Sequence, residues 1–465
     1  MFNRYTIGAY VLASIFIISF AGDLYRMPIQ VGDSMEEILG AEQTPSVTAM
    51  FVQNLVQVAY LRPLRRAQIK AVFDLSGGRY HLAYRGVHVV LFAITVWLFV
   101  RALKVAGPLD FAAGAFALTV LLGSHTFSPA MGAAYPINHF LQITCYALAA
   151  LNLAQARPGW TRDLFACVLF VAAALTLESG LLVWVVLAAA WVIGFRGVSS
   201  RGVAAVTVLL AGYMLLRFAV LDVGAPALTE RASGFLFEML ESDELQARFG
   251  STPFGFYAYN VVSSAASVLF AEPRAGVFVA TRALLEDTLL PREVVPVVTS
   301  TLTTSLIAAA AWLWLRRRAP VDDNARLIAV FAAVLAANSV ISYGYTKSDI
   351  VGVAGAFYAV AAFAALRALV AAAPARRPAV NAVCGLMIAI AAAGWAIRTA
   401  GLHYLLVDQA FKQRLDWVSP PLKDATTPAR LAIVQALRAD ALERRPAIAP
   451  AFRPGWVDRW FESLY

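Results

Sequence analysis

The sequence predicts an all-α, polytopic membrane protein with about eleven transmembrane helices and extracytoplasmic loop helices. Of the 465 residues, 60% are hydrophobic and only 14% are charged, whereas charged residues make up about 25% of a typical soluble domain. Apolar stretches that are long enough, or nearly so, to cross about 30 Å of hydrocarbon recur along the whole chain. Basic residues are concentrated in alternate loops between these stretches.

The expected spans follow one another at short intervals in both halves of the chain. Residues 6–22 form the first span, which we interpret as uncleaved because no clear small-residue cleavage site follows it. The others are residues 87–106, 110–124, 138–155, 164–177, 180–195, 202–220, 297–315, 327–343, 350–371 and 379–399. The pair around Glu178 is short, which predicts little tilt, local thinning of the bilayer or a re-entrant hairpin.

The distribution of basic residues predicts a cytoplasmic N-terminus, because lysine and arginine accumulate in cytoplasmic loops. With this orientation every short basic loop lies on the inside, and these loops carry essentially the whole net charge of +9. They contain Arg101 with Lys104, Arg157 with Arg162, Arg196 with Arg201, Arg316 to Arg318 with Arg326, and Arg376 with Arg377. The positive charge therefore implies no nucleic-acid partner. We expect a multi-pass protein of a bacterial cytoplasmic (inner) membrane.

The same orientation leaves three substantial regions outside. Residues 1–400 are expected to form the transmembrane domain, with outer loops at about 23–86 and 221–296. Residues 401–465 are expected to form an extracytoplasmic helical tail. Chemistry is expected on this outer side, because the large loops lie there.

Three segments outside the expected spans are predicted to be helical. Residues 253–270 are apolar enough for a twelfth span, but a span there would send the basic cluster at Arg316 outward. We therefore assign 253–270 and 278–290 to helices at the outer leaflet, with the twelfth span as the alternative. The tail is expected to contain an amphipathic helix near 428–443.

Acidic residues gather after the first span, and Asp33 is the candidate catalytic base. A carboxylate beside an apolar wall loses water, which raises its pKa and suits it to general-base chemistry. Glu36 and Glu37 follow it closely. The alternative is structural, because Asp33 and Ser34 also form a typical helix start with acids in the first turn.

Basic residues follow in the same loop. Arg62, Arg65 and Arg66 surround a Pro-Leu pair, and Arg79 with His81 leads into the second span. Cations at a headgroup boundary can bind lipid phosphate through charge-assisted hydrogen bonds. The alternative is that these side chains are snorkelling anchors.

Further candidates lie beside the later spans. Glu178, at a membrane boundary, is a functional candidate by default, although an acid in a hairpin turn would look the same. Lys347, Asp349 and Tyr345 would place a cation, an acid and an aromatic ring together on the outer face. His125 and His139 border one outer loop and could bind a sugar, or be ordinary interface residues. The spacing of the histidines predicts no metal site.

Several of these motifs, in this order, resemble the GT-C superfamily of polyprenyl-phosphate-dependent glycosyltransferases, in its protein O-mannosyltransferase-like branch. The resemblance covers roughly residues 1–400. Its motifs are Asp33 after the first span, Tyr60-x-Arg62-Pro63-Leu64, Gly77-x-x-Tyr80-His81-Leu82 with His88, Thr176 to Gly180, Tyr213-x-x-x-Arg217, and Tyr343 to Asp349 followed by Gly355 and Tyr358.

The resemblance implies an inverting glycosyltransferase whose donor is a sugar on a polyprenyl phosphate. Asp33 would deprotonate an acceptor hydroxyl on a glycan, lipid or protein. Arg62, Arg217 and Lys347 would neutralise the phosphate leaving group. His81, His125, His139, Glu178, Tyr345 and Asp349 are the possible substrate-binding residues. Whether a divalent metal takes part stays open.

Two departures from the family pattern set limits on this assignment. The loop from Ser124 to Asn138 contains no acid, and Leu177 stands where the branch often has a lysine before Glu178. The alternatives are a transporter or flippase for lipids or polysaccharides, or an O-antigen-type polymerase or ligase. Transporters usually show internal repeats, and polymerases a strongly basic late outer loop. We find neither feature.

Overall fold

The structure, a computed structural model, is almost entirely helical. It describes residues 3–56, 61–222, 228, 232–251, 253–272, 277–317, 321–373, 377–419 and 427–443, apart from the side chains of Asp33, Val56, Arg292 and Arg317. The strands within these residues are β1 (Ser233–Phe235) and β2 (Glu238–Leu240), which pair antiparallel as a short hairpin. The all-α prediction is confirmed.

Seven helices in the described part of the chain are long and apolar enough to cross a membrane, judged by length and composition. They are α1 (Arg4–Arg26), α5 (Tyr80–Leu103), α11 (Ser200–Leu215) continued by η2 (Leu216–Val220), α15 (Pro291–Arg317), α16 (Asp323–Ile341), α17 (Gly352–Ala371) and α18 (Pro378–Asp416). The shorter ones are α6 (Pro108–Gly123), α8 (His139–Ala154), α9 (Trp160–Ala174), α10 (Leu182–Val192) and α13 (Phe254–Phe270). The chain is thus a multi-pass membrane protein, and each of the expected spans overlaps one of these helices.

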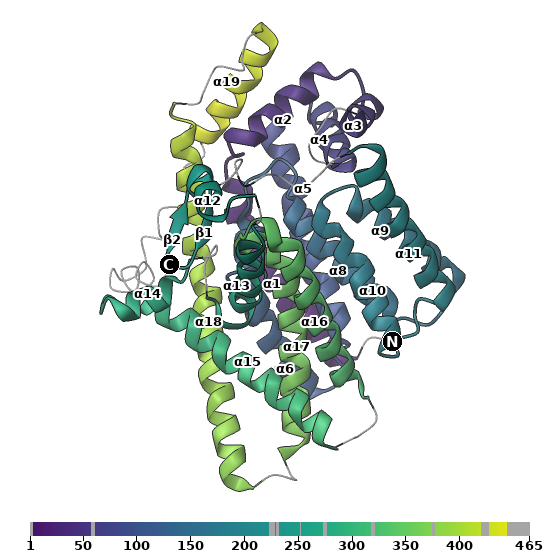
Figure 1. The fold of residues 1–465 in the computed structure, drawn as a ribbon, viewed down its shortest axis with the longest axis vertical. Helices are drawn as coiled ribbons and strands as arrows, with labels where there is room; N and C mark the ends of the chain where they lie inside the picture. The colour runs from purple at the N-terminus through teal and green to yellow at the C-terminus, as the bar shows by residue number, and fades with distance from the viewer. Residues whose placement is uncertain are drawn as a thin grey trace.

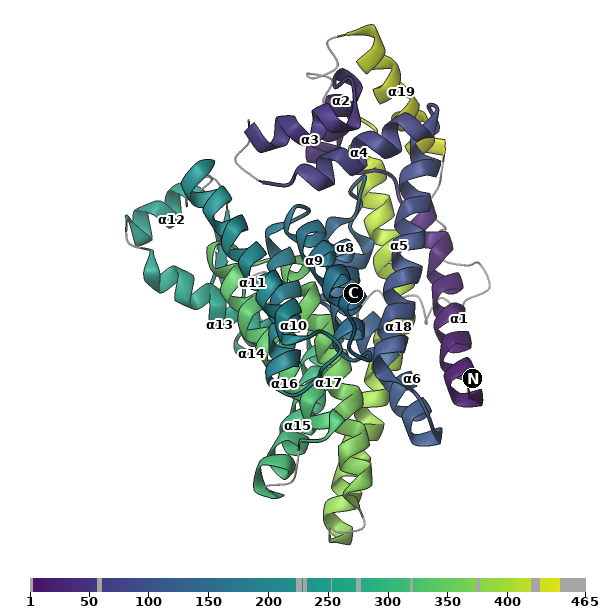
Figure 2. The same cartoon turned by 90° about the vertical axis from the view of Figure 1, so that its right-hand side faces the viewer.

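Small helices connect the long ones. They are α2 (Gly32–Gln43), α3 (Val47–Val56), α4 (Pro63–Ser76), α7 (Phe127–Gly132), η1 (Glu178–Leu181), α12 (Ser242–Phe249), α14 (Val279–Leu285), η4 (Ser342–Gly344), η5 (Ser348–Val351) and α19 (Pro428–Glu443). In both views α2, α3, α4 and α19 gather at the top of the bundle (Figures 1 and 2). We call this end the loop-helix end.

α17 is the central helix of the bundle, because its sequence is small and apolar on every side. All residues from Gly352 to Leu366 are buried, as expected for a helix that is hydrophobic all round. A Cβ added at Gly355 would collide with the side chain of Thr126. Small residues let helices approach closely in membranes, so the loop before α7 packs directly on α17.

The basic loops come together at the opposite end of the bundle, which we call the basic end. The connecting contacts are Asn3 to the Ala106 carbonyl (2.9 Å), Lys104 to the Gln155 carbonyl (3.1 Å), Arg367 with Asp110 (2.8 Å), and Gly194 packed against Arg326. The N-terminus and the loops after α5, α8, α10 and α15 therefore share one end. This grouping matches the charge pattern on which the predicted orientation depends.

The course of α15 bears on the segment before it. α15 ends at Arg317, and Arg326 in the first turn of α16 lies at the basic end, so α15 begins toward the loop-helix end. α13 also starts there, because Asn260 donates to the carbonyl of Tyr343 (2.8 Å) in η4. Both ends of the stretch from α13 to α15 thus lie on one side, which favours a loop helix over a twelfth span.

α18 continues without a break through the expected domain boundary at residue 400. Its 39 residues correspond to about 58 Å at 1.5 Å per residue, far more than about 30 Å of hydrocarbon. The last part of α18 therefore extends beyond the bilayer and connects to α19, which matches the helix expected near 428–443.

Candidate functional site

An ion pair between Arg62 and Glu178 joins the first large loop to the turn between α9 and α10. The Arg62 guanidinium donates from Nε (3.1 Å) and Nη2 (2.8 Å) to Oε2 of Glu178. The N–H of Arg62 donates to Oδ1 of Asn54 (2.8 Å), and the N–H of Leu64 donates to the carbonyl of Leu175 at the end of α9 (3.0 Å). The loop before α4 is thus fixed against the turn that carries Glu178.

Arg217 brings a second guanidinium to the same carboxylate. Its Nη2 lies 3.6 Å from Oε1 of Glu178, and its Nη1 donates to the hydroxyl of Tyr213 (3.2 Å). Arg217 lies in η2, a π-helical turn at the end of α11, and such turns occur frequently at functional sites. Two of the three predicted phosphate-binding cations therefore converge on one predicted substrate-binding acid. We call Arg62, Glu178 and Arg217 the charge cluster.

Gly180 fixes the position of Glu178. The N–H of Gly180 donates to the carbonyl of Leu177 (2.8 Å), which tightens the 3₁₀ turn η1. A Cβ at position 180 would collide with the backbone carbonyl of Ala173. Only glycine lets this turn fold back onto the end of α9, and the carboxylate two residues earlier is set in place by that fold.

A second ion pair lies beside the charge cluster, between Arg65 of α4 and Glu37 of α2. The Arg65 Nη2 is 2.7 Å from Oε1 and 2.8 Å from Oε2 of Glu37, and the two side chains are only 6% and 7% exposed. Burial lowers the pKa of the Arg65 guanidinium, and the Glu37 carboxylate partly offsets this effect. The Arg65 guanidinium also lies over the ring of Tyr135, 5.6 Å from its centroid.

Lys347 approaches the same region from the loop between η4 and η5. It pairs with Asp349 at 3.3 Å. Burial lowers the pKa of Lys347, but its neighbours, Asp349 first among them, raise it by more, so the side chain is a cation. His139, at the start of α8, lies within electrostatic reach of Arg62, Arg65 and Lys347. Cations from the start of α4 and from the loop between η4 and η5 therefore lie near His139.

Lys347 also lines a cavity of about 420 Å³, in the size range of about 300–1,000 Å³ that is typical of small-molecule sites. The titratable residues that line it are His125, Glu272, Glu293, Lys347, Asp349 and Arg398. His125 bonds to the hydroxyl of Ser267 (2.9 Å). Burial raises the pKa of the Glu272 carboxyl. The lining offers hydrogen-bond donors and acceptors together, which suits a hydroxyl-rich ligand.

Arg398, in α18, is buried and points inward. Its Nη1 donates to the hydroxyl of Thr299 (3.0 Å) and to that of Ser300 (3.3 Å), and its guanidinium lies 4.2 Å from the ring of Trp395. Arg398, Glu37, Glu272 and Glu293 are site residues that were not predicted from the sequence. Their charge inside or beside apolar segments was the only available signal.

Some predicted site residues make contacts away from the charge cluster, and others lie outside the described part of the structure. His81 bonds to the carbonyl of Tyr25 (2.6 Å), a contact that joins α5 to the end of α1. Tyr345 lies two residues before Lys347, and its N–H donates to the carbonyl of Ser342 (3.3 Å). The backbone of Asp33 belongs to α2, one turn before Glu37 and on the same face, but its side chain lies outside the described part of the structure, as does Tyr60.

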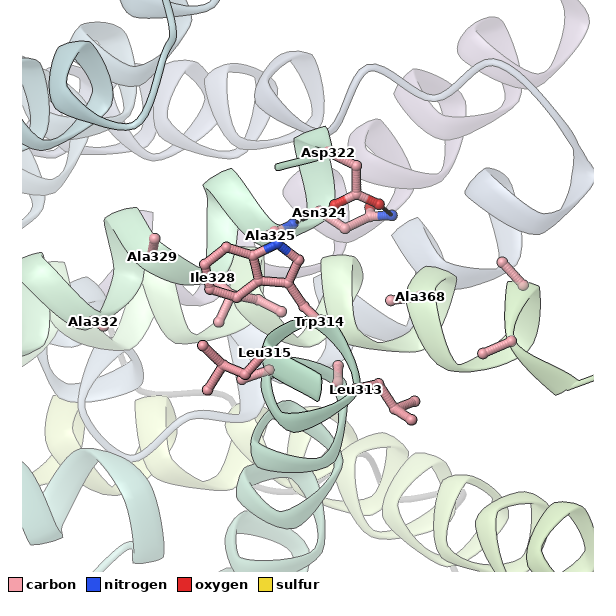
Figure 3. Close-up of a pocket in the computed structure, with 14 residues that line it drawn as sticks. Leu313, Trp314, Leu315, Asp322, Asn324, Ala325, Ile328, Ala329, Ala332 and Ala368 are labelled. Carbon is pink, nitrogen blue, oxygen red and sulfur yellow. Dashed lines mark hydrogen bonds between the residues drawn. The ribbon is translucent and has the colours of Figure 1, made fainter. Parts of the chain in front are cut away.

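A second cavity, of about 410 Å³, lies between α15, α16 and α17 at the basic end (Figure 3). Trp314 of α15 lies beside Ala325 and Ile328 of α16, and most of the lining is alanine. Asp322, at its rim, caps α16 by accepting from the N–H of Ala325 (2.8 Å). The Asp322 carboxylate serves as a helix cap and the remaining lining is mostly apolar, so this cavity lies outside the candidate site.

Comparisons with known proteins give no further guidance on the site. No family model, curated protein or solved structure matches this chain. Among the described residues, no group of three or more histidines, cysteines or acids could hold a metal ion.

Proposed function

We propose that this chain is an inverting membrane glycosyltransferase of the GT-C type, with about eleven spans and its site on the extracytoplasmic side. Its donor is a sugar on a polyprenyl phosphate, and its acceptor is a hydroxyl of a glycan, lipid or protein. The charge cluster carries the proposal, because two guanidinium groups at the loop-helix end share one carboxylate. Lys347 adds a third cation nearby.

The proposed chemistry uses these groups in one displacement. Asp33 takes the proton of the acceptor hydroxyl, whose oxygen attacks the anomeric carbon opposite the leaving group. The bond from that carbon to the phosphate oxygen breaks, and the electron pair stays on the polyprenyl phosphate. Arg62, Arg217 and Lys347 stabilise the negative charge that develops there, which is where fixed cations help most.

The cavity beside Lys347 supports a place for the acceptor. Its volume and mixed donors and acceptors fit a polyhydroxylated group. His125 and Asp349 line it, whereas His139 lies within electrostatic reach of Arg62 and Arg65. In this proposal Lys347 stands between the donor phosphate and the acceptor.

Replacing Asp33 by Asn tests the chemistry. We predict that membranes containing D33N fail to release polyprenyl phosphate from a panel of labelled polyprenyl-phosphate sugars, whereas membranes with the unaltered chain release it. Expression and binding of the lipid phosphate should persist in D33N, because the cations are unchanged. Full activity in D33N would remove Asp33 from the mechanism. Movement of the labelled lipid across the bilayer with its sugar bond intact would indicate a flippase.

A further inference from the structure

The two oxygens of the Glu178 carboxylate are divided between two guanidinium groups. Oε2 accepts from Arg62 at 2.8 and 3.1 Å, and Oε1 faces Arg217 at 3.6 Å. These arginines are far apart in sequence and come from different elements. An anion with several oxygens, such as a phosphate, would bridge the same two groups in the same way.

The Glu178 pair is more open than the neighbouring pair in α2 and α4. The side chains of Arg62 and Glu178 are each 22% exposed, against 6% and 7% for Arg65 and Glu37. The distance of 3.6 Å to Arg217 also exceeds that of a hydrogen bond. An entering anion can therefore reach the Glu178 carboxylate from the side of Arg62, whereas Arg217, which is 9% exposed, and the Arg65 pair are enclosed.

We infer that Glu178 is an internal counter-ion. Its carboxylate occupies the anion site between Arg62 and Arg217 and is displaced when a phosphate binds there. This inference rests on the proposed function, since it assumes that the two arginines bind the phosphate of a polyprenyl lipid. The leaving group, a polyprenyl monophosphate, carries a charge of about −1.5 to −2 near neutral pH, so it competes better against the single carboxylate than the donor does, whose phosphodiester carries one negative charge.

This arrangement has two consequences for the reaction. Glu178 keeps both guanidinium groups oriented and compensated before the lipid arrives, which lowers the cost of leaving buried charges unpaired. It also weakens the hold on the phosphate leaving group, because displacing Glu178 costs part of the binding energy. Glu178 is therefore a positioning residue that limits product inhibition.

Binding of farnesyl monophosphate, with farnesol as the probe that lacks the phosphate, tests the inference on purified full-length protein. Glu178→Gln removes the competing charge at nearly constant shape. We expect E178Q to bind farnesyl monophosphate up to about fivefold more tightly than the unaltered chain, since about 1 kcal/mol is the upper end of the range for a partly exposed ion pair. Farnesol binding should not change.

The matched control is Asp110→Asn, which breaks the ion pair of Asp110 with Arg367 (2.8 Å) at the basic end. D110N should leave the affinity for farnesyl monophosphate unchanged, and R62A should weaken it. In a chain that carries both R62A and R217A, adding E178Q should have no effect, because the site that Glu178 occupies is gone.

The possible results separate the two proposals. If the unaltered chain binds the phosphate, R62A binds it less well and E178Q binds it equally or less well, Glu178 is no competitor and the inference fails alone. If neither the unaltered chain nor E178Q prefers farnesyl monophosphate to farnesol, the proposed donor site falls as well. If E178Q is unstable, its affinity is judged from the rise in its melting temperature when farnesyl monophosphate is added. A smaller rise than in the unaltered chain contradicts the inference.

Discussion

Two ion pairs bring Arg62 and Arg217 to the carboxylate of Glu178. Arg62, Glu178 and Arg217 were each recognisable from short motifs, because charge beside an apolar segment is costly and suggests function. The pairing of Arg62 with Glu178 was not predictable, since it joins residues 116 positions apart. The burial of Arg398 was not predictable either, because a snorkelling arginine and a buried arginine have the same sequence pattern.

Gly180→Ala tests whether the turn η1 positions Glu178. The added methyl would meet the carbonyl of Ala173, so we expect a loss of about 1–3 kcal/mol in stability, the usual cost of overpacking. Binding of farnesyl monophosphate should change as well, because Glu178 must move.

The control for this change is Gly212→Ala in α11, where nothing lies within 4 Å of the added Cβ. G212A should melt at the same temperature as the unaltered chain or slightly higher. Equal melting temperatures for G180A and the unaltered chain would show that η1 does not depend on its glycine.

Hydropathy predicted the helical elements well, and packing decided the rest. The expected spans overlap the observed helices because long apolar runs have few alternatives in a membrane. The continuation of α18 past residue 400 was missed. It depends on Leu402, Leu406 and Ala410, which are buried at four-residue spacing in a segment that contains too many charged residues to look like a span.

α2 and α4 form a platform that depends on the buried pair of Glu37 with Arg65. We predict that Glu37→Gln destabilises this platform, because removing one partner of a buried ion pair costs about 3–5 kcal/mol. Hydrogen exchange should increase in α2 and α4 before it increases in α17.

Glu286→Gln is the matched control, because the pair of Glu286 with Arg282 is 51% and 53% exposed. E286Q should change stability by less than about 1 kcal/mol. Similar losses in E37Q and E286Q would contradict the assignment of Glu37 as a structural counter-ion.

The basic loops and the charge cluster lie toward opposite ends of the molecule. The N-terminus, the loops that contain Lys104 and Gly194, and the start of α16 with Arg326 share the basic end, and the charge cluster lies toward α2 and α4. The prediction of a cytoplasmic N-terminus came from charge alone. The structure groups the loops in the same way.

Single cysteines test this polarity in a chain from which Cys145, Cys167 and Cys384 have been removed. Leu75, at the end of α4, is 85% exposed, and Arg201, at the start of α11, is exposed. A membrane-impermeant maleimide should label L75C in intact cells and R201C only after permeabilisation. Labelling of both in intact cells would contradict the topology.

The central claim is that Arg62 and Arg217 bind the phosphate of a polyprenyl lipid. The most direct test is an experimental structure of the protein in a lipid nanodisc with a polyprenyl monophosphate. We predict phosphate density between the two guanidinium groups, with Glu178 turned away from them. Phosphate density only at the basic end, with Glu178 still between Arg62 and Arg217, would contradict the account.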